Sequence, residues 1–567
     1  MRIFFLILFQ VLCTSLTVIG SPSRPEVCAK DGCIQGVVES GRLKPYEAFY
    51  GIPFAEPPVG KLRFENPVSH SGWSGYWNAS YYRGDCFQKN YFIPGIPLSG
   101  SEDCLHLNIY RPQDWKSKGK LPVFVWIHGG AFLSFSSDPK ILGPDYLMDN
   151  GEVIFVTLNY RLGFFGFLCS GDGAVKGNFG LKDQQLALEW VARNIESFGG
   201  DSNSITLGGS SSGGVATNLQ MINPKSQALF HRVMMSSGNA LVPFQYPIDF
   251  QAQMRTLAKI SGLKDSDTAT TQSLASQLKD LPALTLVNAI DSLFVFALTP
   301  VSPVRFCIEG DWDGAFLTED PRKVWAEGSF EQKPILSGTT AHEGIFAGLI
   351  VVNKTLRQHF NANINALLPI QMDMKPSWTG EVLKHYLGDK DYIDETNEND
   401  YLRMFGDRMF HYPSFELILE YIQYADVQKN PVFVYEFAYE GKYTFFKYLA
   451  GSDEHRGVSH LDDIIYLISM PGLIPTLEPE TLDGKMSDLF VKTVVNFAKT
   501  GRISEWKPCT LVLLEPFCDY QIFNKTTDSK EVAVPSSNTV NKEMMLLWLK
   551  VDRDVEYMDP DEFDEDQ

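Results

Sequence analysis

Residues 205–217, ITLGGSSSGGVAT, contain three consecutive serines with a pair of glycines on each side. The short apolar run SITL (204–207) precedes the glycines, and the helical pattern GVATNLQMI (214–222) follows the serines. A sharp strand-to-helix turn with glycine two residues before and two after a serine presents that serine as a nucleophile. The alternative is a flexible Gly/Ser loop, but the flanking strand and helix patterns favour the reactive turn.

Only one of the three serines fits this spacing. Ser211 has Gly209 two residues before it and Gly213 two residues after it. Ser210 would need glycine where Ser212 stands, and Ser212 would need glycine where Ser210 stands. Because neighbouring backbone approaches such a turn closely, glycine is required at both places. The pattern therefore predicts that Ser211 is the nucleophile.

Strand and helix patterns alternate along much of the chain. Near-continuous apolar runs, typical of strands covered on both faces, include LPVFVWI (121–127), EVIFVTLNY (152–160), RVMMSSG (232–238), KPILSGTT (333–340) and PVFVYEF (431–437). The segment LKDQQLALEWVARNIESF (181–198) has apolar residues at helical spacing. This alternation predicts an α/β fold with a large, mostly parallel central sheet flanked by helices. We find no repeat or linker and expect one domain over residues 21–567.

A second glycine motif follows an early buried strand. In VWIHGGAF (125–132), Gly129 and Gly130 come directly after the strand, as in loops whose backbone N–H groups bind an oxyanion. The residue after the nucleophile, Ser212, is expected to supply a further N–H group. His128 is expected to orient this loop rather than to act as a catalytic base.

Seven segments carry a specific family resemblance. They are YEAFYGIPFAEPPVGKLRF (46–64), SEDCLHLNIYRP (101–112), VWIHGGAF (125–132), LNYRLGFFGFL (158–168), GNFGLKDQQLALEWVARNI (177–195), FGGDSNSITLGGSSSGG (198–214) and GVSHLDDIIYL (457–467). From about residue 25 to the C-terminal region, the chain resembles the type-B carboxylesterase and cholinesterase family. The resemblance implies the α/β-hydrolase fold and a serine ester hydrolase that uses an acyl-enzyme, with no cofactor.

The family motifs also supply the partners of the serine. LSGTTAHEGIF (336–346) matches the segment that holds the family's catalytic acid, and GVSHLDD (457–463) matches the segment that holds its histidine. The resemblance therefore implies a triad of Ser211, Glu343 and His460. It further implies that Ser237 lies near the triad as a hydrogen-bond partner. Two structural ion pairs are also implied, Arg63 with Glu102 and Arg161 with Asp183.

The eight cysteines after residue 20 fit an oxidising compartment. Cys86 and Cys104 are close in sequence, and their pairing matches the family's early disulfide. Two further candidate pairs are Cys28 with Cys33, which flank a potential Asp-Gly hairpin turn, and Cys509 with Cys518. Cys169 and Cys307 are left over, and the sequence leaves open whether they are free or bonded. The chain has no CxxC pair and no HExxH motif, so we expect no metal site.

The ends and the charge of the chain indicate export. Residues 1–20 have a basic start and a short apolar run, as in a signal peptide; a membrane anchor is the alternative. Sequons at Asn78, Asn353 and Asn524 are candidate glycosylation sites. The net charge of −20 disfavours nucleic acid as a partner. We therefore expect a secreted protein without a membrane span that acts on a small ester.

The turn departs from the common family pattern at both neighbours of the nucleophile. Family members usually have Glu, Gln or His before it and Ala after it, whereas this chain has Ser210 and Ser212. The first disulfide loop, 87–103, contains no tryptophan for a choline group, so choline esters are disfavoured. We expect a lipophilic ester, in the style of secreted insect carboxylesterases. The alternatives are a juvenile hormone esterase proper and a non-catalytic adhesion protein of the neuroligin type.

Overall fold

The computed structural model describes residues 24–93, 98–243, 249–452, 454, 456–512, 515–526, 530–537 and 541–555. Its centre is a 12-stranded sheet in the order β16-β15-β12-β11-β10-β9-β7-β8-β6-β4-β3, with β17 also paired to β15. The strands are β3 Val37–Ser40, β4 Pro45–Pro53, β6 His106–Pro112, β7 Leu121–Ile127, β8 Ile154–Leu158, β9 Gly200–Ser210, β10 Arg232–Ser236, β11 Ile335–Thr340, β12 Val432–Phe437, β15 Tyr520–Lys525, β16 Val532–Ala533 and β17 Ser536–Ser537.

The middle of this sheet is parallel. Strands β8, β7, β9, β10, β11, β12 and β15 run in one direction. The antiparallel pairs are those of β6, β4 and β3 on one side of the sheet and those of β16 and β17 with β15 on the other. The predicted mostly parallel sheet is confirmed, and the run 121–127 is β7 from end to end. Because the strands are parallel, their carboxyl ends meet at one edge of the sheet, where the loops after them can form a site.

Helices cover both faces of the sheet. Alternate residues of β7 point to opposite sides: Val123 and Val125 belong to one buried cluster, and Phe124 and Trp126 belong to the other. The first cluster packs under α3 (Phe179–Asn194), α4 (Ser212–Ile222) and α14 (Tyr412–Tyr424), and the second packs under α1 (Asp145–Asn150) and α16 (Leu482–Thr500). The two buried clusters explain why β7 is apolar at every position.

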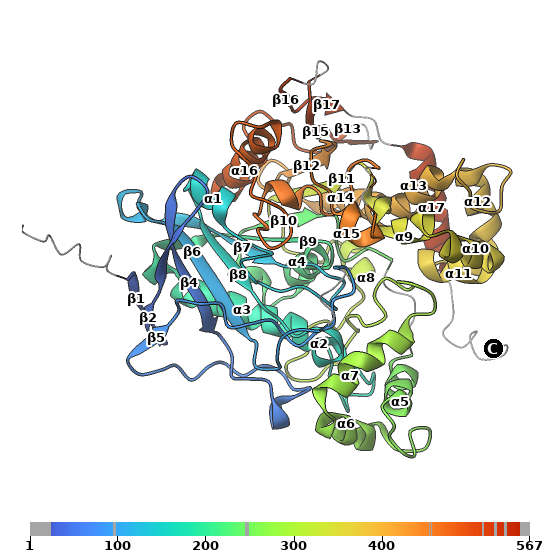
Figure 1. Ribbon diagram of the computed structural model, residues 1–567, viewed down its shortest axis with the longest axis horizontal. Helices are drawn as coiled ribbons and strands as arrows, with labels where there is room; N and C mark the ends of the chain where they lie inside the picture. Colours follow the sequence, from blue (N-terminus) through green and yellow to red (C-terminus); the bar gives the residue numbers. More distant parts are fainter. Residues whose placement is uncertain are drawn as a thin grey trace, which may run out of the picture.

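Smaller elements extend the fold at its two ends (Figure 1). At one end lies a three-stranded sheet of β1 (Glu26–Ala29), β2 (Gly32–Gln35) and β5 (Tyr76–Asn78). At the other end lie α10 (Lys354–Ala362), α11 (Ile364–Met372), α12 (Thr379–Leu387) and α13 (Glu398–Gly406), and α5 (Phe250–Ile260), α6 (Thr271–Asp280) and α7 (Ala283–Ala289) form a separate group. The remaining longer helix is α17 (Lys542–Val555). Among the described residues, no helix combines the length and apolarity that a membrane crossing requires.

The structure joins all eight cysteines of the described chain in four disulfides. Cys28 and Cys33 face each other across the β1–β2 hairpin, at the place where the Asp-Gly turn was expected to bring them. Cys86 is bonded to Cys104, and Cys509 to Cys518. The fourth disulfide links Cys169 to Cys307, whose pairing the sequence had left open. They are 138 residues apart in the chain, and only the packing of distant segments brings them together.

Both expected ion pairs are formed near the sheet. Arg161 donates to both carboxylate oxygens of Asp183, at 2.7 and 2.8 Å, and both side chains are buried. Arg63 donates through Nε to Glu102 at 2.7 Å. Each guanidinium also donates to backbone carbonyls, those of Glu65 and Leu281 among them, so the pairs tie separate loops together.

Candidate active site

Ser211 lies at the turn between β9 and α4. Its backbone has φ +56° and ψ −129°, a conformation that is strained for any residue other than glycine. A Cβ atom on Gly209 would lie 2.3 Å from the carbonyl oxygen of Gly213, and one on Gly213 would lie 2.2 Å from that of Ile127. Gly209 and Gly213, whose spacing identified Ser211 in the sequence, therefore have no room for a side chain.

Glu343 follows β11, two strands away from β9 in the sheet order. Its carboxylate is fully buried and accepts hydrogen bonds from the Thr340 amide at 2.7 Å and from the Ser237 hydroxyl at 2.5 Å, both at Oε1. The other oxygen, Oε2, lies 2.6 Å from Nδ1 of His460. Burial works to raise the pKa of Glu343, but the charge and hydrogen bond of His460 outweigh it, so the pKa lies below its ordinary value.

His460 comes from the loop after β12 and α15 (Phe446–Ala450). The ring is fully buried and packs against the ring of Phe410, with centroids 4.3 Å apart. Because Nδ1 is bound to Glu343, Nε2 is the nitrogen that remains for chemistry at a neighbouring atom. Both His460 and Ser211 line one cavity, whose empty space is about 370 Å³ when open solvent is included.

The walls of this catalytic cavity are mostly apolar. Its further lining comes from Phe92, Gly130, Ala131, Phe135, Val301, Phe410, Leu449 and Leu461. A second apolar cavity, with about 390 Å³ of empty space when open solvent is included, lies beside it and shares Phe135 and Leu461 as walls. The second cavity is lined by Ser210 and Gly129 together with Trp126, His128 and Met470. The small Ser210 side chain therefore leaves space next to the nucleophile.

The glycine loop turns through Gly130 and Ala131, which both have positive φ, of 104° and 54°. The sequence prediction named Gly129 and Gly130, and Ala131 is the next residue in the same motif. The structure puts Gly130 and Ala131 in the catalytic cavity and Gly129 in the cavity beside it. Ser212 begins α4, where the first backbone N–H groups have no partner within the helix.

His128 does not line the catalytic cavity. Its ring stacks on Tyr160 with centroids 4.4 Å apart, and its Nδ1 lies 2.8 Å from the carbonyl oxygen of Gly129. Burial lowers the pKa of His128 to about 4, so the ring is neutral at physiological pH. The geometry fits the expected role of holding the glycine loop.

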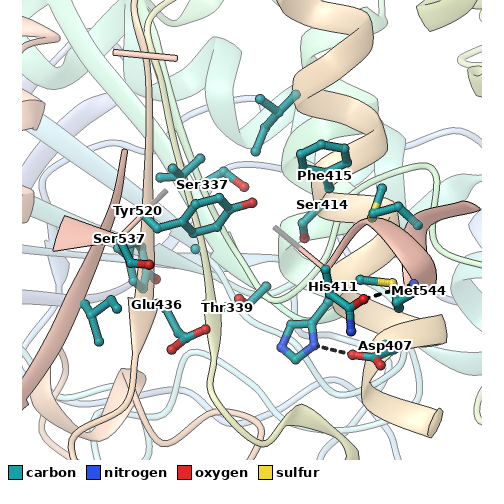
Figure 2. A pocket seen from close by; sticks show the side chains of 17 residues that line it. Ser337, Thr339, Asp407, His411, Ser414, Phe415, Glu436, Tyr520, Ser537 and Met544 are labelled. Carbon is teal, nitrogen blue, oxygen red and sulfur yellow. Dashed lines mark hydrogen bonds and ion pairs between the residues drawn. The ribbon is translucent and has the colours of Figure 1, made fainter. Parts of the chain in front are cut away.

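His411 is a residue near the site that sequence analysis did not find. Its Nδ1 lies 3.0 Å from Asp407 Oδ1, and its Nε2 lies 3.0 Å from the carbonyl oxygen of Thr340. Figure 2 shows the His411–Asp407 pair on the wall of a separate cavity, with Thr339 and Glu436 across from it. Asp407 lies four residues before His411 in the same helical segment, but the Thr340 carbonyl comes from a distant strand, and the i, i+4 pair alone does not show that this histidine lies near the site.

The three sequons differ in exposure. Asn78 and Asn353 are exposed, and the Asn353 side chain caps α10 by accepting from the Leu356 amide at 3.1 Å. Asn524 lies within β15 and is partly buried. Among the described residues there is no group of three or more His, Cys, Asp or Glu that could hold a metal ion.

Comparisons with known proteins agree across nearly the whole chain. The model of the carboxylesterase family matches residues 23–543. Juvenile hormone esterase of Tribolium castaneum is 36% identical over 85% of this chain and 84% of its own length. Venom carboxylesterase-6 of Apis mellifera is 32% identical, over 84% and 86% of the two chains.

A solved structure also matches. It is that of juvenile hormone esterase from Manduca sexta with OTFP covalently attached, and it superimposes with a TM-score of 0.80. That structure is 25% identical in sequence and covers 94% of this chain and 100% of its own.

Proposed function

The chain belongs to the carboxylesterase family and is a carboxylic ester hydrolase, and we propose that it works through an acyl-enzyme formed on Ser211. The observation that carries this proposal is the 2.6 Å contact between His460 and Glu343 at the cavity that Ser211 also lines. In this arrangement His460 is the base and Glu343 is its partner. The Manduca sexta relative, with a compound covalently attached, supports a covalent mechanism.

The reaction has two halves. The Ser211 hydroxyl attacks the ester carbonyl while His460 takes its proton, and the protonated ring then gives that proton to the leaving alcohol. Water attacks the acyl-enzyme with the same base, which releases the acid and restores the serine. Glu343 holds the ring in the tautomer that leaves Nε2 free of its proton, and it stabilises the imidazolium that forms.

We assign the oxyanion donors to the backbone N–H groups of Gly130, Ala131 and Ser212. This differs from the sequence expectation of Gly129, Gly130 and Ser212. The support is that Gly130 and Ala131 line the cavity with Ser211, whereas Gly129 lines the neighbouring cavity. One such donor typically contributes about 3–4 kcal/mol to lowering the barrier.

The substrate class is a lipophilic ester. Five of the side chains around Ser211 and His460 are Phe92, Phe135, Phe410, Leu449 and Leu461, and the cavity on the Ser210 side is also lined mainly by apolar residues. Apolar walls favour apolar acyl and alcohol groups, because burial of both surfaces drives binding.

Hydrolysis of juvenile hormone itself is the second candidate. Esterases named for that hormone, from Tribolium castaneum and Manduca sexta, are similar to this chain over most of its length. The small Ser210 next to the nucleophile enlarges the neighbouring cavity, which favours shifted specificity over an unchanged hormone site.

We also propose that the protein is secreted as a single domain, residues 21–567, after cleavage of residues 1–20. The cleaved segment lies outside the described residues. Support comes from the four disulfides, which are typical of oxidising compartments. The exposed Asn78 and Asn353 are the sequons most accessible to glycosylation, and Asn524 is the third.

The deciding experiment compares the secreted protein with its Ser211→Ala variant on aryl acetates, aryl hexanoates and juvenile hormone. We expect hydrolysis by the wild type and a loss of at least about 1000-fold in the variant, because the attacking oxygen is gone. Ser210→Ala is the matched control, since it removes a neighbouring hydroxyl and leaves the triad intact. Equal rates in Ser211→Ala and wild type would refute the assignment of the nucleophile. Faster turnover of juvenile hormone than of every aryl ester would establish the second candidate.

A further inference from the structure

A third cavity lies next to the catalytic cavity and has a different character. It is formed by the segment 293–305, by α5 and by α11 with the turn after it, and it encloses about 1680 Å³ when the open solvent at its mouth is included. Most of its walls are apolar, with Leu293, Ile370, Met374 and Met409 among them. Val301 lines both this cavity and the catalytic one, so the two adjoin at this residue.

Arg305 lines this third cavity, and its side chain is unusual among the buried arginines. The residue is only 8% exposed, and its Nε has no hydrogen-bond partner among the described residues. The described part of the chain also places no carboxylate within 4.0 Å of its guanidinium, whereas Arg161 and Arg111 are both paired with acids. A buried charge without a partner is costly, so its retention needs a reason.

The carboxylate of Asp373 is the charge that opposes the effect of burial on the pKa of Arg305. Burial lowers the pKa of Arg305, and the charge of Asp373, which also lines the cavity, opposes that shift without forming an ion pair. Burial in turn raises the pKa of Asp373, against the charges of Arg305 and Arg408. Asp373 therefore compensates Arg305 only in part and leaves its N–H groups available for another acceptor.

Three of the other polar side chains on the walls are hydrogen-bonded within the protein. Gln253 donates to the carbonyl oxygen of Pro303 at 2.8 Å, and the Ser302 hydroxyl contacts the carbonyl oxygens of Ala131 and Val304. The Gln371 amide oxygen accepts from a tyrosine hydroxyl at 2.9 Å. The Arg305 guanidinium is thus a buried cation whose Nε has no hydrogen-bond partner among the described residues, in a cavity with mostly apolar walls.

We propose that this third cavity is a binding site for a fatty carboxylate, held by an ion pair between its carboxylate and Arg305. The alkyl chain lies against the apolar walls, and the guanidinium supplies the charged, planar donor that suits a carboxylate. The site needs none of the triad residues, so it stands apart from the proposed catalytic mechanism. Acids of this class are also the products of lipophilic ester hydrolysis.

The test is isothermal titration calorimetry of the full secreted chain with dodecanoate, kept below its critical micelle concentration, to measure the dissociation constant. We expect Arg305→Gln to weaken dodecanoate binding more than tenfold, and Arg305→Lys, which keeps the charge, to weaken it less. Asp373→Asn removes a negative charge from the same cavity and is expected to tighten binding. Asparagine also tolerates the left-handed backbone of this position, where φ is 49°.

Two controls separate a binding role from a structural one. With 1-dodecanol, which has the same chain and no charge, wild type and Arg305→Gln are expected to bind with equal affinity. The melting temperature of Arg305→Gln is expected to equal or exceed that of wild type, because a buried unpaired charge is gone. Unchanged dodecanoate affinity in Arg305→Gln would overturn the proposal. Parallel losses of dodecanol binding and melting temperature would overturn it as well. These readouts need no ester hydrolysis, so they remain decisive even if Ser211 is not the nucleophile.

Discussion

His411 and Glu343 are linked through a single residue, Thr340, which is hydrogen-bonded to both. The Thr340 amide donates to Glu343 Oε1 at 2.7 Å, and the Thr340 carbonyl oxygen lies 3.0 Å from His411 Nε2. The charge of His411 is one of the influences that lower the pKa of Glu343. A positive charge behind the carboxylate helps to keep it ionised and able to hold His460.

The His411–Asp407 pair should make stability depend on pH. Burial lowers the pKa of His411, but the hydrogen bond and charge of Asp407 outweigh it and raise that pKa to about 9, against 6.5 ordinarily. A raised histidine pKa contributes stability that is fully present below pH 6.5 and is lost as the pH rises through about 9. We expect Asp407→Asn to lower the free energy of unfolding by up to about 3 kcal/mol at pH 6 and by little at pH 10.

Chemical denaturation of wild type and Asp407→Asn at several pH values checks this prediction. His359→Gln, which changes an exposed histidine elsewhere, is the control and should give a difference that does not vary in this way. A deficit of Asp407→Asn that is constant from pH 6 to pH 10 would show that the charge pair contributes nothing.

The charge of Glu343 should matter much more for turnover than the Ser237 hydroxyl that binds it. Glu343→Gln keeps the shape but removes the charge that stabilises the imidazolium, so we expect kcat to fall by about 10³–10⁴-fold. Ser237→Ala removes one of two donors to Oε1 and leaves the Thr340 amide in place, so a loss of about tenfold in kcat is expected. Steady-state kinetics on one aryl ester measures both. A loss in Ser237→Ala as large as that in Glu343→Gln would mean that Ser237 does more than position the carboxylate.

Local patterns in the sequence were sufficient for the sheet and for the turn at Ser211. The strand 121–127 is apolar at every position because both of its faces are buried, and this signal needs no knowledge of the partners. The glycine spacing around Ser211 likewise reflects contacts within a few residues of the turn. Glu343 and His460 came from the family resemblance, since counting alone could not choose among the histidines.

What the sequence could not reveal depends on long-range packing. His411 gains its link to the triad from Thr340, and Arg305 its counter-charge from Asp373, and both of these partners are distant in the chain. The glycine motif drew attention to Gly129 and Gly130, whereas our proposed donors include Ala131, which adopts φ 54°. A strained alanine next to a nucleophile is the kind of exception that functional sites tolerate.

Ser210 should control the size of the ester that is accepted. It lines the cavity of about 390 Å³ beside the catalytic one, and a glutamine in its place would occupy part of that space. We expect Ser210→Gln to lower kcat/KM for 1-naphthyl esters about tenfold more than for methyl esters of the same acid. The matched variant Ser210→Ala should leave this ratio unchanged. The same ratio in Ser210→Gln and wild type would exclude the cavity from substrate binding.

The Cys169–Cys307 disulfide should contribute substantially to stability. It joins residues 138 positions apart, and a cross-link over so long a loop restricts the unfolded chain strongly. Both residues are buried, and the Cys307 carbonyl oxygen and amide are also fixed by hydrogen bonds to the Asn178 side chain, at 2.8 and 2.9 Å. Removal of the bond should therefore act mainly on the unfolded state and leave the folded segments in place.

We expect the double variant Cys169→Ser, Cys307→Ser to lose about 2–5 kcal/mol of unfolding free energy, with a lower melting temperature and a near-normal kcat for the folded enzyme. The single variant Cys169→Ser also lacks the disulfide but keeps Cys307. It should be destabilised as much as the double variant if the loss of the bond, and not the serine at position 307, is the cause. Thiol titration of the denatured wild type without reductant should find no free cysteine. Two reactive thiols in that titration, together with unchanged stability in the double variant, would show that Cys169 and Cys307 are not bonded.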